Sequence, residues 1–244
     1  MVEHRELRIL QYNVQKSRDV VLASLFQNSK TLEYDILAIQ EPWRNPFIAT
    51  SYHPLKSHFQ FTYFEDATTR VCFYINKRLD ISKWTVTNHS EDIQTLTIRT
   101  EAAETQTGET LQIHNVYNPS PASYSSKEPG TIETLRKILE ITVSETNHVV
   151  VGDFNLHHPL WSSIERLTRH EAADILLEVA YNHSLELVTP RGTITWRARG
   201  TQSTIDLAFL SQSLVTRVKK CVPRQDLAQL SDHILIKLTV HLQA

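Results

Sequence analysis

The chain has 244 residues, of which 41% are hydrophobic and 21% charged, with a formal net charge of −2. This composition excludes intrinsic disorder. The near-neutral charge excludes a surface coated with basic residues, but it permits a local basic patch. The sequence has no apolar run long enough to span a membrane and no Gly-rich phosphate loop, and its polar start, Met1 to Arg8, is unlike a signal peptide.

Two cysteines, Cys72 and Cys221, lie far apart in apolar, strand-like runs. We interpret them as buried thiols in a reducing compartment, because their spacing fits neither a disulfide framework nor a zinc site. No internal repeat, low-complexity tract or linker divides the chain, so a single domain over residues 1–244 is expected.

The first predicted elements deliver polar side chains at their ends. Residues 7–14 read as a strand that ends in Asn13, and residues 34–40 read as a buried strand that runs into Glu41, where Pro42 stops it. Residues 19–27 between them have helical periodicity. Closely spaced alternating segments then predict an antiparallel meander, at residues 59–64, 71–75, 84–86, 93–98 and 111–117, with a hairpin turn at 104–109 and a helix at 131–143.

The stretch from His148 to Asn155 reads as a short strand buried on both faces, because Val149 to Val151 are β-branched. Gly152 then permits a tight backbone conformation, and Asp153 and Asn155 follow it. An active site built on a rigid strand is one interpretation. The alternative is a simple Asx turn, in which both side chains bond only to the backbone.

The last third of the chain predicts one helix and several strands. Thr168 to Glu171 matches a capping box before a helix whose buried face would carry Ala172, Ile175, Leu176 and Val179. Strands are expected at residues 185–188, 193–197, 205–210, 218–222 and 234–240. The predicted fold class is therefore an α/β (α+β) sandwich, with two packed, mainly antiparallel β-sheets flanked by helices.

Polar groups recur where the predicted strands end, and their chemistry is narrow. They comprise Asn13, Glu41, Tyr117, Asp153, Asn155, Asp206, Asp232 and His233. The set lacks cysteine and paired histidine ligands, which argues against zinc. Hard oxygen ligands suit Mg²⁺ or Mn²⁺.

Such a set has the chemistry to hydrolyse a phosphodiester. Glu41 would hold the metal, Asp153 would orient or deprotonate the attacking water, and His233, held by Asp206, would stabilise charge on the phosphate. Asn13, Asn155 and Tyr117 would supply neutral hydrogen bonds. Each residue also has a plain structural alternative as a turn, cap or edge residue, except that Asp206 inside an apolar strand requires a partner.

In this order, the motifs around these residues resemble the endonuclease/exonuclease/phosphatase superfamily, which includes pancreatic deoxyribonuclease and abasic-site endonucleases. Residues 152–161 (GDFNLHHPLW) and 203–207 (STIDL) are similar to the endonuclease domain of non-LTR retrotransposons. The resemblance implies a deoxyribonuclease-I-like fold and an enzyme that nicks target DNA to leave a 3′-hydroxyl for reverse transcription.

The resemblance also implies individual roles. Glu41 matches the metal ligand, with Asn13 and Asp232 near the metal, and Tyr117 matches a phosphate-contacting tyrosine. Asp153 and Asn155 match the water-activating pair, Asp206 the carboxylate that orients the histidine, and His233 that histidine. Gln15 departs from the pattern, because abasic-site enzymes carry an aspartate there, and this disfavours an abasic-repair role.

The segment from Thr189 to Gly200 is the best candidate for contacts with DNA. It is expected to form a protruding hairpin in which the arginines meet phosphates and the tryptophan stacks or contacts sugars, through Arg191, Thr195, Trp196, Arg197 and Arg199. An edge hairpin with a core tryptophan and solvated arginines is the equal alternative. Weaker candidates are Lys16, Ser17, Arg18 and Arg70, while Lys219 and Lys220 read as a solvated pair. Surface placement is favoured for His157 and His158, with the alternatives that they line the site or bind a metal.

The leading hypothesis is a Mg²⁺-dependent DNA endonuclease that acts as a monomer on nuclear DNA. A phosphoesterase of the same fold for a small or lipid substrate is the second, and an inactive DNA-binding remnant is the third. No reverse-transcriptase sequence follows Ala244. The chain is therefore expected to be an excised domain, a processed product or a free-standing relative of a polyprotein that contains a reverse transcriptase.

Overall fold

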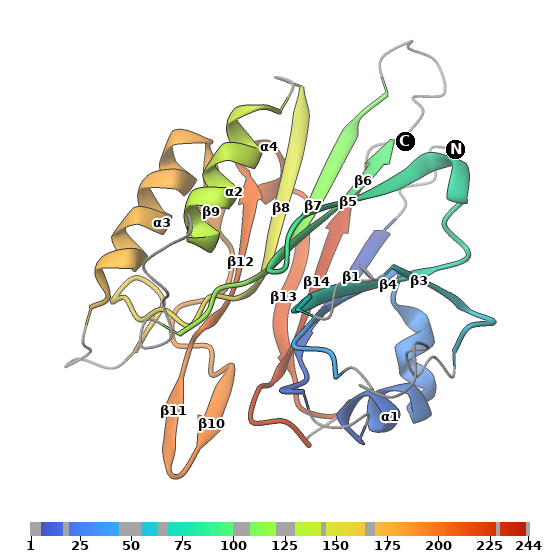
Figure 1. The fold of residues 1–244 in the computed structure, drawn as a ribbon, viewed down its shortest axis with the longest axis horizontal. Coiled ribbons are helices and arrows are strands. Elements are labelled where there is room, and N and C mark those ends of the chain that lie inside the picture. Colours follow the sequence, from blue (N-terminus) through green and yellow to red (C-terminus); the bar gives the residue numbers. More distant parts are fainter. Residues whose placement is uncertain are drawn as a thin grey trace.

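The computed structural model describes residues 6–16, 20–43, 55–62, 68–99, 108–120, 130–142, 145–163, 169–227 and 230–242. Two six-stranded sheets pack face to face in this part of the chain (Figure 1). The predicted turn at 104–109 lies almost wholly outside the described residues, as do Ser17, Arg18 and Thr168.

The first sheet, called the β1 sheet here, contains the N-terminal and C-terminal strands. Its order is β13 (Val218–Arg224), β14 (Leu235–His241), β1 (Glu6–Asn13), β2 (Ile36–Gln40), β4 (Val71–Asn76) and β3 (Phe59–Thr62). Strands β1 and β2 are parallel, and the other neighbours are antiparallel.

The second sheet, called the β8 sheet here, has the same arrangement around a central parallel pair. Its order is β5 (Trp84–Ser90), β6 (Ile93–Arg99), β7 (Thr110–Tyr117), β8 (Thr146–Asp153), β12 (Asp206–Ser211) and β9 (Leu185–Leu187). Only β7 and β8 are parallel among these neighbours. The predicted sandwich of mainly antiparallel sheets is therefore confirmed. The predicted antiparallel meander is confirmed for β5 to β7 and wrong for all five segments together, because β3 and β4 join the other sheet.

The helices lie on the outer faces of the two sheets, as Figure 1 shows. They are α1 (Val20–Gln27), α2 (Thr131–Glu140), α3 (Glu171–Asn182) and the single turn α4 (Gln212–Val215), with short 3₁₀ segments η1 (Ser29–Glu33) and η2 (Ile81–Lys83). Strands β10 (Trp196–Ala198) and β11 (Thr201–Ser203) form a separate hairpin that projects from the sandwich.

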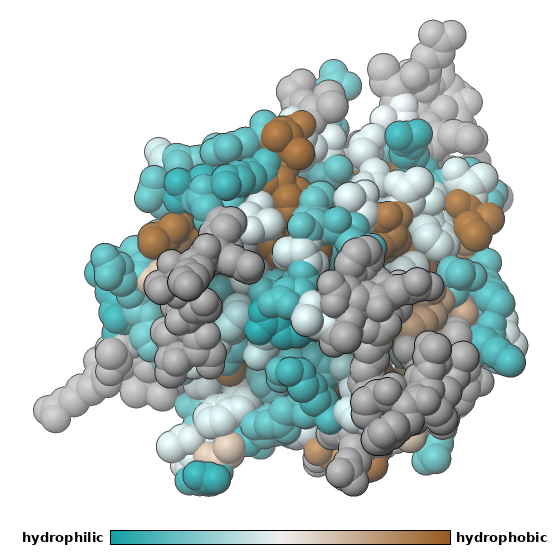
Figure 2. All heavy atoms as spheres, viewed as in Figure 1, coloured by the Kyte–Doolittle hydropathy of each residue, from teal (hydrophilic) through white to brown (hydrophobic). Residues whose placement is uncertain are grey.

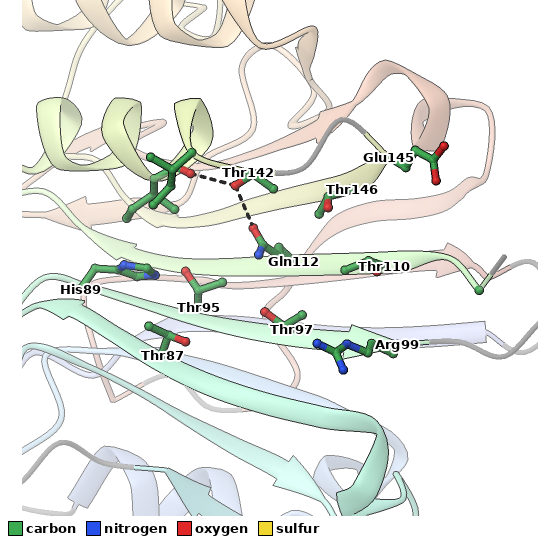
Figure 3. Close-up of a pocket in the computed structure, with 13 residues that line it drawn as sticks. Thr87, His89, Thr95, Thr97, Arg99, Thr110, Gln112, Thr142, Glu145 and Thr146 are labelled. Atoms are coloured by element: carbon green, nitrogen blue, oxygen red, sulfur yellow. Dashed lines mark hydrogen bonds between the residues drawn. The ribbon is translucent and has the colours of Figure 1, made fainter.

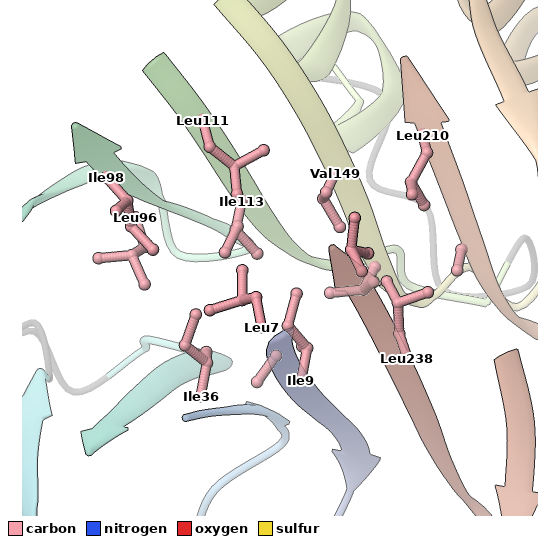
Figure 4. Packing of buried hydrophobic residues seen from close by; sticks show 14 of the residues in the cluster. Leu7, Ile9, Ile36, Leu96, Ile98, Leu111, Ile113, Val149, Leu210 and Leu238 are labelled. Carbon is pink, nitrogen blue, oxygen red and sulfur yellow. The ribbon is translucent and has the colours of Figure 1, made fainter. Parts of the chain in front are cut away.

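Alternation along the strands explains the core between the sheets. Leu7 and Ile9 on β1 face Ile113 on β7 and Val149 on β8 across the sandwich (Figure 4), and all are at most 1% exposed. The opposite faces carry a second set of apolar residues, which α2 and α3 cover on the β8 sheet and α1 covers on the β1 sheet. Burial of two apolar faces per sheet is the main force that holds the four layers together.

At one end of the sandwich, the same inward-facing positions become polar. Period-2 alternation leads from apolar residues to buried polar ones on five strands: Leu7 and Ile9 to Gln11 and Asn13, Ile36 and Ala38 to Gln40, Leu111 and Ile113 to Asn115, Val149 and Val151 to Asp153, and Leu210 and Ala208 to Asp206. The strands that build the core therefore also position these polar groups.

Helix α3 differs in detail from its prediction. It begins after His170, whose side chain makes no capping bond, so the capping box does not set the start of the helix. Its buried residues are Ala173, Leu176, Val179 and Ala180, whereas Ile175 is 40% exposed. The buried stripe is rotated by about one residue from the predicted face, because Ala173 and Ala180 allow close approach to the β8 sheet.

The two cysteines and the surface have the properties that the composition predicts. Cys72 and Cys221 are free and buried. In the viewed face of Figure 2, apolar residues form separate patches among polar ones, as expected when most apolar area is buried between layers. None of the described helices is long and apolar enough to cross a membrane.

Candidate active site

The polar end of the sandwich gathers side chains from both sheets. Asp206 begins β12 and pairs with Asp153, which ends β8, and Tyr117 at the end of β7 also pairs with Asp153. Asn13 ends β1 beside Gln40, the last residue of β2. Because several strands end together, residues that are far apart in sequence become neighbours.

Gly152 is required for the close approach that places Asp153. A Cβ atom at Gly152 would lie 1.8 Å from the carbonyl oxygen of Val116 on the neighbouring parallel strand. No side chain fits there without displacing the backbone. The glycine therefore lets β7 and β8 stay paired up to the residues that end them, Tyr117 and Asp153.

Asp153 is a buried carboxylate with several donors around it. Its Oδ2 atom accepts from Asn13 Nδ2 at 2.8 Å and Asn155 Nδ2 at 3.0 Å, and its Oδ1 accepts from the Asn155 main-chain N–H at 3.0 Å. Burial and the charge of Asp206 raise the pKa of Asp153 to about 7, against the opposite effects of His233 and Asn13. The carboxylate can therefore exchange a proton near neutral pH.

His233 and Asp206 form a buried, charge-assisted pair. His233 Nδ1 lies 2.9 Å from Asp206 Oδ2, and His233 Nε2 lies 3.7 Å from Asp153 Oδ2 and 3.8 Å from Asp232 Oδ1. Burial alone lowers the pKa of His233, but Asp206, Asp153 and Asp232 together outweigh it and raise that pKa to about 9. The ring is therefore cationic at neutral pH, with its Nε2–H facing the site.

Asp232 connects the site to the projecting hairpin. Its Oδ2 atom accepts from Gln15 Nε2 at 2.7 Å and from Trp196 Nε1 at 2.8 Å. Its Oδ1 atom is buried and has no hydrogen-bond partner. This oxygen faces the His233 ring at 3.8 Å and accepts no hydrogen bond, so it keeps lone pairs that a cation at the site could use.

Glu41 and Tyr117 lie together on the other side of Asp153. Burial raises the pKa of Tyr117, and the charges of Glu41 and Asp153 raise it further. Glu41 has a positive φ of 49°, and main-chain hydrogen bonds to Arg70 and Lys16 hold it in this uncommon conformation. Arg70 also lies over the Tyr117 ring, with 5.2 Å between its Cζ and the ring centroid.

The donor atoms present fit a hard divalent cation better than a soft one. Asp153, Asp206 and His233 offer ligand atoms within 4.8 Å of one another. A protonated His233 bonded to Asp206 is a poor ligand, however, so we read these three as a buried charge relay, in which His233 is hydrogen-bonded to Asp206 and its Nε2 lies 3.7 Å from Asp153 Oδ2. Carboxylate and amide oxygens of Glu41, Asn13 and Asp232 remain as candidate ligands, and Oδ1 of Asp232, which accepts no hydrogen bond, fits such a role.

The candidate DNA-contacting residues divide into two groups. Arg197 and Arg199 are exposed on the hairpin, with Arg199 and Gly200 forming its turn at positive φ. Arg191 is exposed too, but its Nε donates to the Ser162 carbonyl at 3.0 Å.

Thr195 was predicted to contact DNA, and this is wrong for its side chain. It is fully buried, and its hydroxyl accepts from the main chain of Ile205 and Asp206. The predicted strand at 193–197 is also shifted, because the paired residues begin only at Trp196. Trp196 is half-buried, and its indole N–H donates to Asp232, so the alternative of a core tryptophan is only partly met and its contact with DNA stays a prediction.

The weaker candidates are also placed. Lys16 is exposed, with its Nζ 4.0 Å from Glu41, whereas Arg70 is bound by Glu91 and Asp92. Lys219 and Lys220 lie exposed on β13, toward the end of β14 that is farther from His233.

The predicted surface placement of His158 is wrong. It is buried against Trp161, with its Nε2 3.4 Å from Asp174, and His157 is half-buried against His170. A turn after the central strand folds this segment back onto helix α3.

Sequence reasoning missed several residues that hold the site together. Gln11 donates to Asp206 at 2.8 Å, Gln15 donates to Asp232, and Ser231 accepts from the His233 main chain at 3.1 Å. Gln11 had a signal in the sequence, because it continues the inward-facing alternation of Leu7 and Ile9 toward Asn13.

A pocket of about 410 Å³ lies away from this site. It is open on the outer face of β5 to β7, and Figure 3 shows that threonines and Gln112 line it, near Glu145 and Thr146. Thr146 begins β8, whereas Asp153 ends it. The pocket is therefore at the opposite end of the strand from the candidate active site.

Comparison with known proteins agrees with the fold. The model of the family described as endonuclease-reverse transcriptase matches residues 111–237, more than half of the 244-residue chain. No curated protein matches the sequence.

Solved structures match over almost the whole chain at low sequence identity. One is the endonuclease domain of TRAS1, a telomere-specific non-LTR retrotransposon, with a TM-score of 0.70 and 19% identity over 98% of this chain and 100% of that one. Another is the AP endonuclease LMAP from Leishmania major, with a TM-score of 0.68 and 13% identity over 98% and 88%. The catalytic domain of Xenopus laevis APE2 has a TM-score of 0.68 and 14% identity over 98% and 94%.

Proposed function

Since the chain belongs to the endonuclease-reverse transcriptase family, we propose that it is a divalent-metal-dependent endonuclease that nicks one strand of DNA. Hydrolysis leaves a 3′-hydroxyl, which in a polyprotein with a reverse transcriptase would prime DNA synthesis at a nuclear target. The single observation that carries this proposal is the buried relay of Asp153, His233 and Asp206 at the polar end of the sandwich.

Asp153 acts as the general base in this proposal. Its carboxylate is oriented by Asn13 and Asn155, and its pKa near 7 is close to the value at which a general base works best at neutral pH. Asn155 is itself fixed, because its Nδ2 also donates to the Asn118 carbonyl at 2.9 Å. A water molecule held by Asp153 would lose its proton as it attacks the phosphorus atom.

His233 provides positive charge opposite the base. Asp206 fixes the Nδ1–H side of the ring, so the Nε2–H side is directed at the site. A cationic imidazole donates a charge-assisted hydrogen bond to a non-bridging phosphate oxygen and stabilises the negative charge that builds up in the transition state. Tyr117 keeps its hydroxyl protonated, because burial and nearby carboxylates raise its pKa, so it can donate to the same phosphate.

Glu41, Asn13 and Asp232 would hold a Mg²⁺ or Mn²⁺ ion. When bound, such an ion polarises a phosphoryl oxygen and stabilises the leaving oxygen. The oxygen-only donor set supports this choice, as does Asp232 Oδ1, which is buried and accepts no hydrogen bond.

The projecting hairpin gives the protein a surface for DNA. Arg197 and Arg199 are exposed on it, and the hydrogen bond of Trp196 to Asp232 fixes the base of the hairpin to the site. Arginine contacts to phosphates supply affinity that does not depend on sequence. With a net charge of only −2, this local placement of cations matters more than the overall charge.

Nicking of supercoiled plasmid tests the proposal. Mg²⁺-dependent conversion to open circles is expected, with loss of the product in EDTA and in Glu41→Gln and His233→Ala. Glu145→Gln is the matched control, because Glu145 is exposed at the opposite end of β8. Extension of the nicked strand by a DNA polymerase would show a free 3′-hydroxyl.

Other outcomes would favour a different function. DNA binding without nicking in Mg²⁺ or Mn²⁺ would indicate an inactive remnant. No action on DNA, together with metal-dependent hydrolysis of a small phosphodiester, would indicate a phosphoesterase.

A further inference from the structure

A chain of buried amide side chains leads from the backbone of the β1 sheet to Asp206. It consists of Asn115 on β7, Gln40 on β2 and Gln11 on β1, which are 0%, 0% and 2% exposed. The three residues lie between the two sheets, where the inward-facing positions change from apolar to polar. Every side-chain polar atom of these three residues is hydrogen-bonded, except the oxygen of Gln11.

The links of this amide chain are short. Asn115 Nδ2 donates to the carbonyl oxygens of Ile39 at 3.1 Å and Cys72 at 2.9 Å. Gln40 Nε2 donates to Asn115 Oδ1 at 2.5 Å and to the Ala38 carbonyl at 3.3 Å. Gln11 Nε2 then donates to Gln40 Oε1 at 2.7 Å and to Asp206 Oδ1 at 2.8 Å.

The direction of donation is fixed from one end. The carbonyls of Ile39 and Cys72 can only accept, so the NH₂ group of Asn115 must face them and its oxygen must face Gln40. Gln40 therefore turns its own NH₂ toward Asn115 and its oxygen toward Gln11. Gln11 in turn must present its NH₂ group, which has one hydrogen for Gln40 and one for Asp206.

Gln11 serves its neighbours and leaves its own oxygen unsatisfied. Its Oε1 atom is buried without a hydrogen-bond partner, which is uncommon for a buried amide. A buried amide that only paired its own polar atoms would not be expected to leave its oxygen without a donor. The orientation is dictated by the two acceptors that it reaches, Gln40 and Asp206.

We propose that Gln11 is a positioning residue that holds Asp206 as a hydrogen-bond acceptor and so orients the His233 ring. The Gln11 donor fixes Asp206 Oδ1, which leaves Oδ2 for His233 Nδ1 at 2.9 Å. Asp206 is also held through its main-chain N–H by Thr195 at 3.0 Å. The effect of Gln11 on turnover rests on the proposed endonuclease function, whereas the effect of Gln11 on the orientation of His233 does not.

Three variants of the full chain test this role, alongside wild type. Gln11→Met keeps the length but removes both donors, and Gln11→Glu keeps the shape but places an acceptor opposite Asp206. Gln94→Met is the matched control, because Gln94 is also a buried amide between the sheets, 1% exposed, but bonds Asn88 and Thr62 instead.

The first measurement is the NMR signal of the His233 Nδ1–H proton in protein labelled with ¹⁵N-histidine, assigned by its loss in His233→Gln. We expect the signal to move or broaden in both Gln11 variants and to stay in place in Gln94→Met. An unchanged signal in Gln11→Met would overturn the proposal. If that variant does not fold, Gln40→Met tests the same chain and must move the signal in the same direction.

The second measurement is steady-state nicking with kcat and KM determined separately. Loss of a hydrogen bond to a charged group predicts a roughly tenfold lower kcat in Gln11→Met, with KM for DNA nearly unchanged, and a larger loss in Gln11→Glu. An equal fall of kcat in Gln94→Met would show a merely structural role. If wild type does not nick DNA, the proposed function fails, but the NMR comparison still decides the role of Gln11.

Discussion

The indole N–H of Trp196 donates to Oδ2 of Asp232 at 2.8 Å, so the projecting hairpin and the candidate active site are joined by a side chain at its base. The main chain strengthens this connection, because Trp196 bridges to His233 and the Arg197 N–H donates to the Asp232 carbonyl at 2.8 Å. The orientation of the hairpin is therefore set by Asp232 and His233.

Trp196→Phe tests this connection, because it keeps an aromatic ring but removes the donor. A hydrogen bond to a charged group contributes about 1.5–3 kcal/mol, so urea unfolding should show a loss of that order. Nick positions on an end-labelled duplex should also spread. Trp84→Phe is the control, since the buried Trp84 Nε1 has no partner to lose. Equal effects of the two substitutions would contradict the role of the Asp232 bond.

Arg197 and Arg199 should contribute to DNA affinity through phosphates. If each contacts one phosphate, replacement by alanine should weaken binding on all sequences alike and reduce the slope of log affinity against log salt by about 1. Fluorescence anisotropy of a labelled duplex over a salt series measures this slope. Lys219→Ala serves as the comparison, because Lys219 is paired with Glu6 away from His233. An unchanged slope in both arginine variants would place DNA elsewhere.

Gly152→Ala should be strongly destabilising. Its Cβ would meet the Val116 carbonyl at 1.8 Å, and backbone that must shift around an inserted methyl group typically costs about 1–3 kcal/mol, occasionally more. We expect a loss at or above the upper end, measured by urea unfolding. Activity should fall further than stability explains, because Asp153 follows directly.

Gly130→Ser is the matched control for Gly152→Ala. An added Cβ at Gly130 meets nothing within 4 Å, and Gly130 caps helix α2, where serine is favoured. Stability should therefore be unchanged or slightly increased. A tolerated Gly152→Ala with normal nicking would show that the β7–β8 pairing is not needed to place Asp153.

The buried histidines of the β8 sheet should make the fold sensitive to acid. His148 lies 3.0 Å from His114, Nδ1 to Nε2, and both are buried. Burial, with the charge of His183, lowers the pKa of His148 to about 4, and burial, with the charge of His148, lowers the pKa of His114 well below its ordinary value.

The sign of this effect follows from proton binding. Below pH 6.5 the unfolded chain protonates His148 while the folded chain does not, so the free energy of unfolding falls as the pH drops from about 6.5 to 4. The contribution of His148 is on the order of 3 kcal/mol. Urea unfolding of His148→Asn at several pH values should show a shallower slope than wild type. His58→Asn is the control, because His58 is exposed. A slope in His148→Asn equal to that of wild type would show that His148 does not cause the acid sensitivity.

The sequence was sufficient for the architecture because alternation and strand ends are local signals. Val149 to Val151 predicted a buried strand, and Asp153 at its end met Asp206 and His233 as expected. The division of the meander between two sheets was not predictable, because alternation shows that a segment is a strand but not which neighbour it pairs with.

The supporting side chains of the site were harder to predict than its acids. Gln11 looked like an ordinary polar residue and Gln15 like a departure from the abasic-site pattern, because hydrogen bonds to Asp206 and Asp232 join positions almost the whole chain apart. Thr195 shows the reverse error, since Arg197 and Arg199 on the hairpin are exposed while its own hydroxyl is buried and accepts from the Asp206 main chain. The direction of the chain where it enters the hairpin sets the burial of Thr195, and this direction is seen only in the folded structure.

Gln15→Glu tests whether this end of the site carries a cation. Gln15 Nε2 donates to Asp232 Oδ2 at 2.7 Å, so a carboxylate of the same shape replaces an attraction with repulsion between like charges. We expect a lower Tm than wild type in EDTA, by several degrees for a loss of about 1–2 kcal/mol. Two adjacent carboxylates hold a divalent ion more strongly than one, so Mg²⁺ should raise the Tm of the variant more than that of wild type. Gln112→Glu on the outer face of β7 is the control. Mg²⁺ should not reduce the difference in Tm between this variant and wild type. A Tm deficit in Gln15→Glu that is the same at every Mg²⁺ concentration would exclude Asp232 from the metal site and leave Glu41 and Asn13 as its candidates.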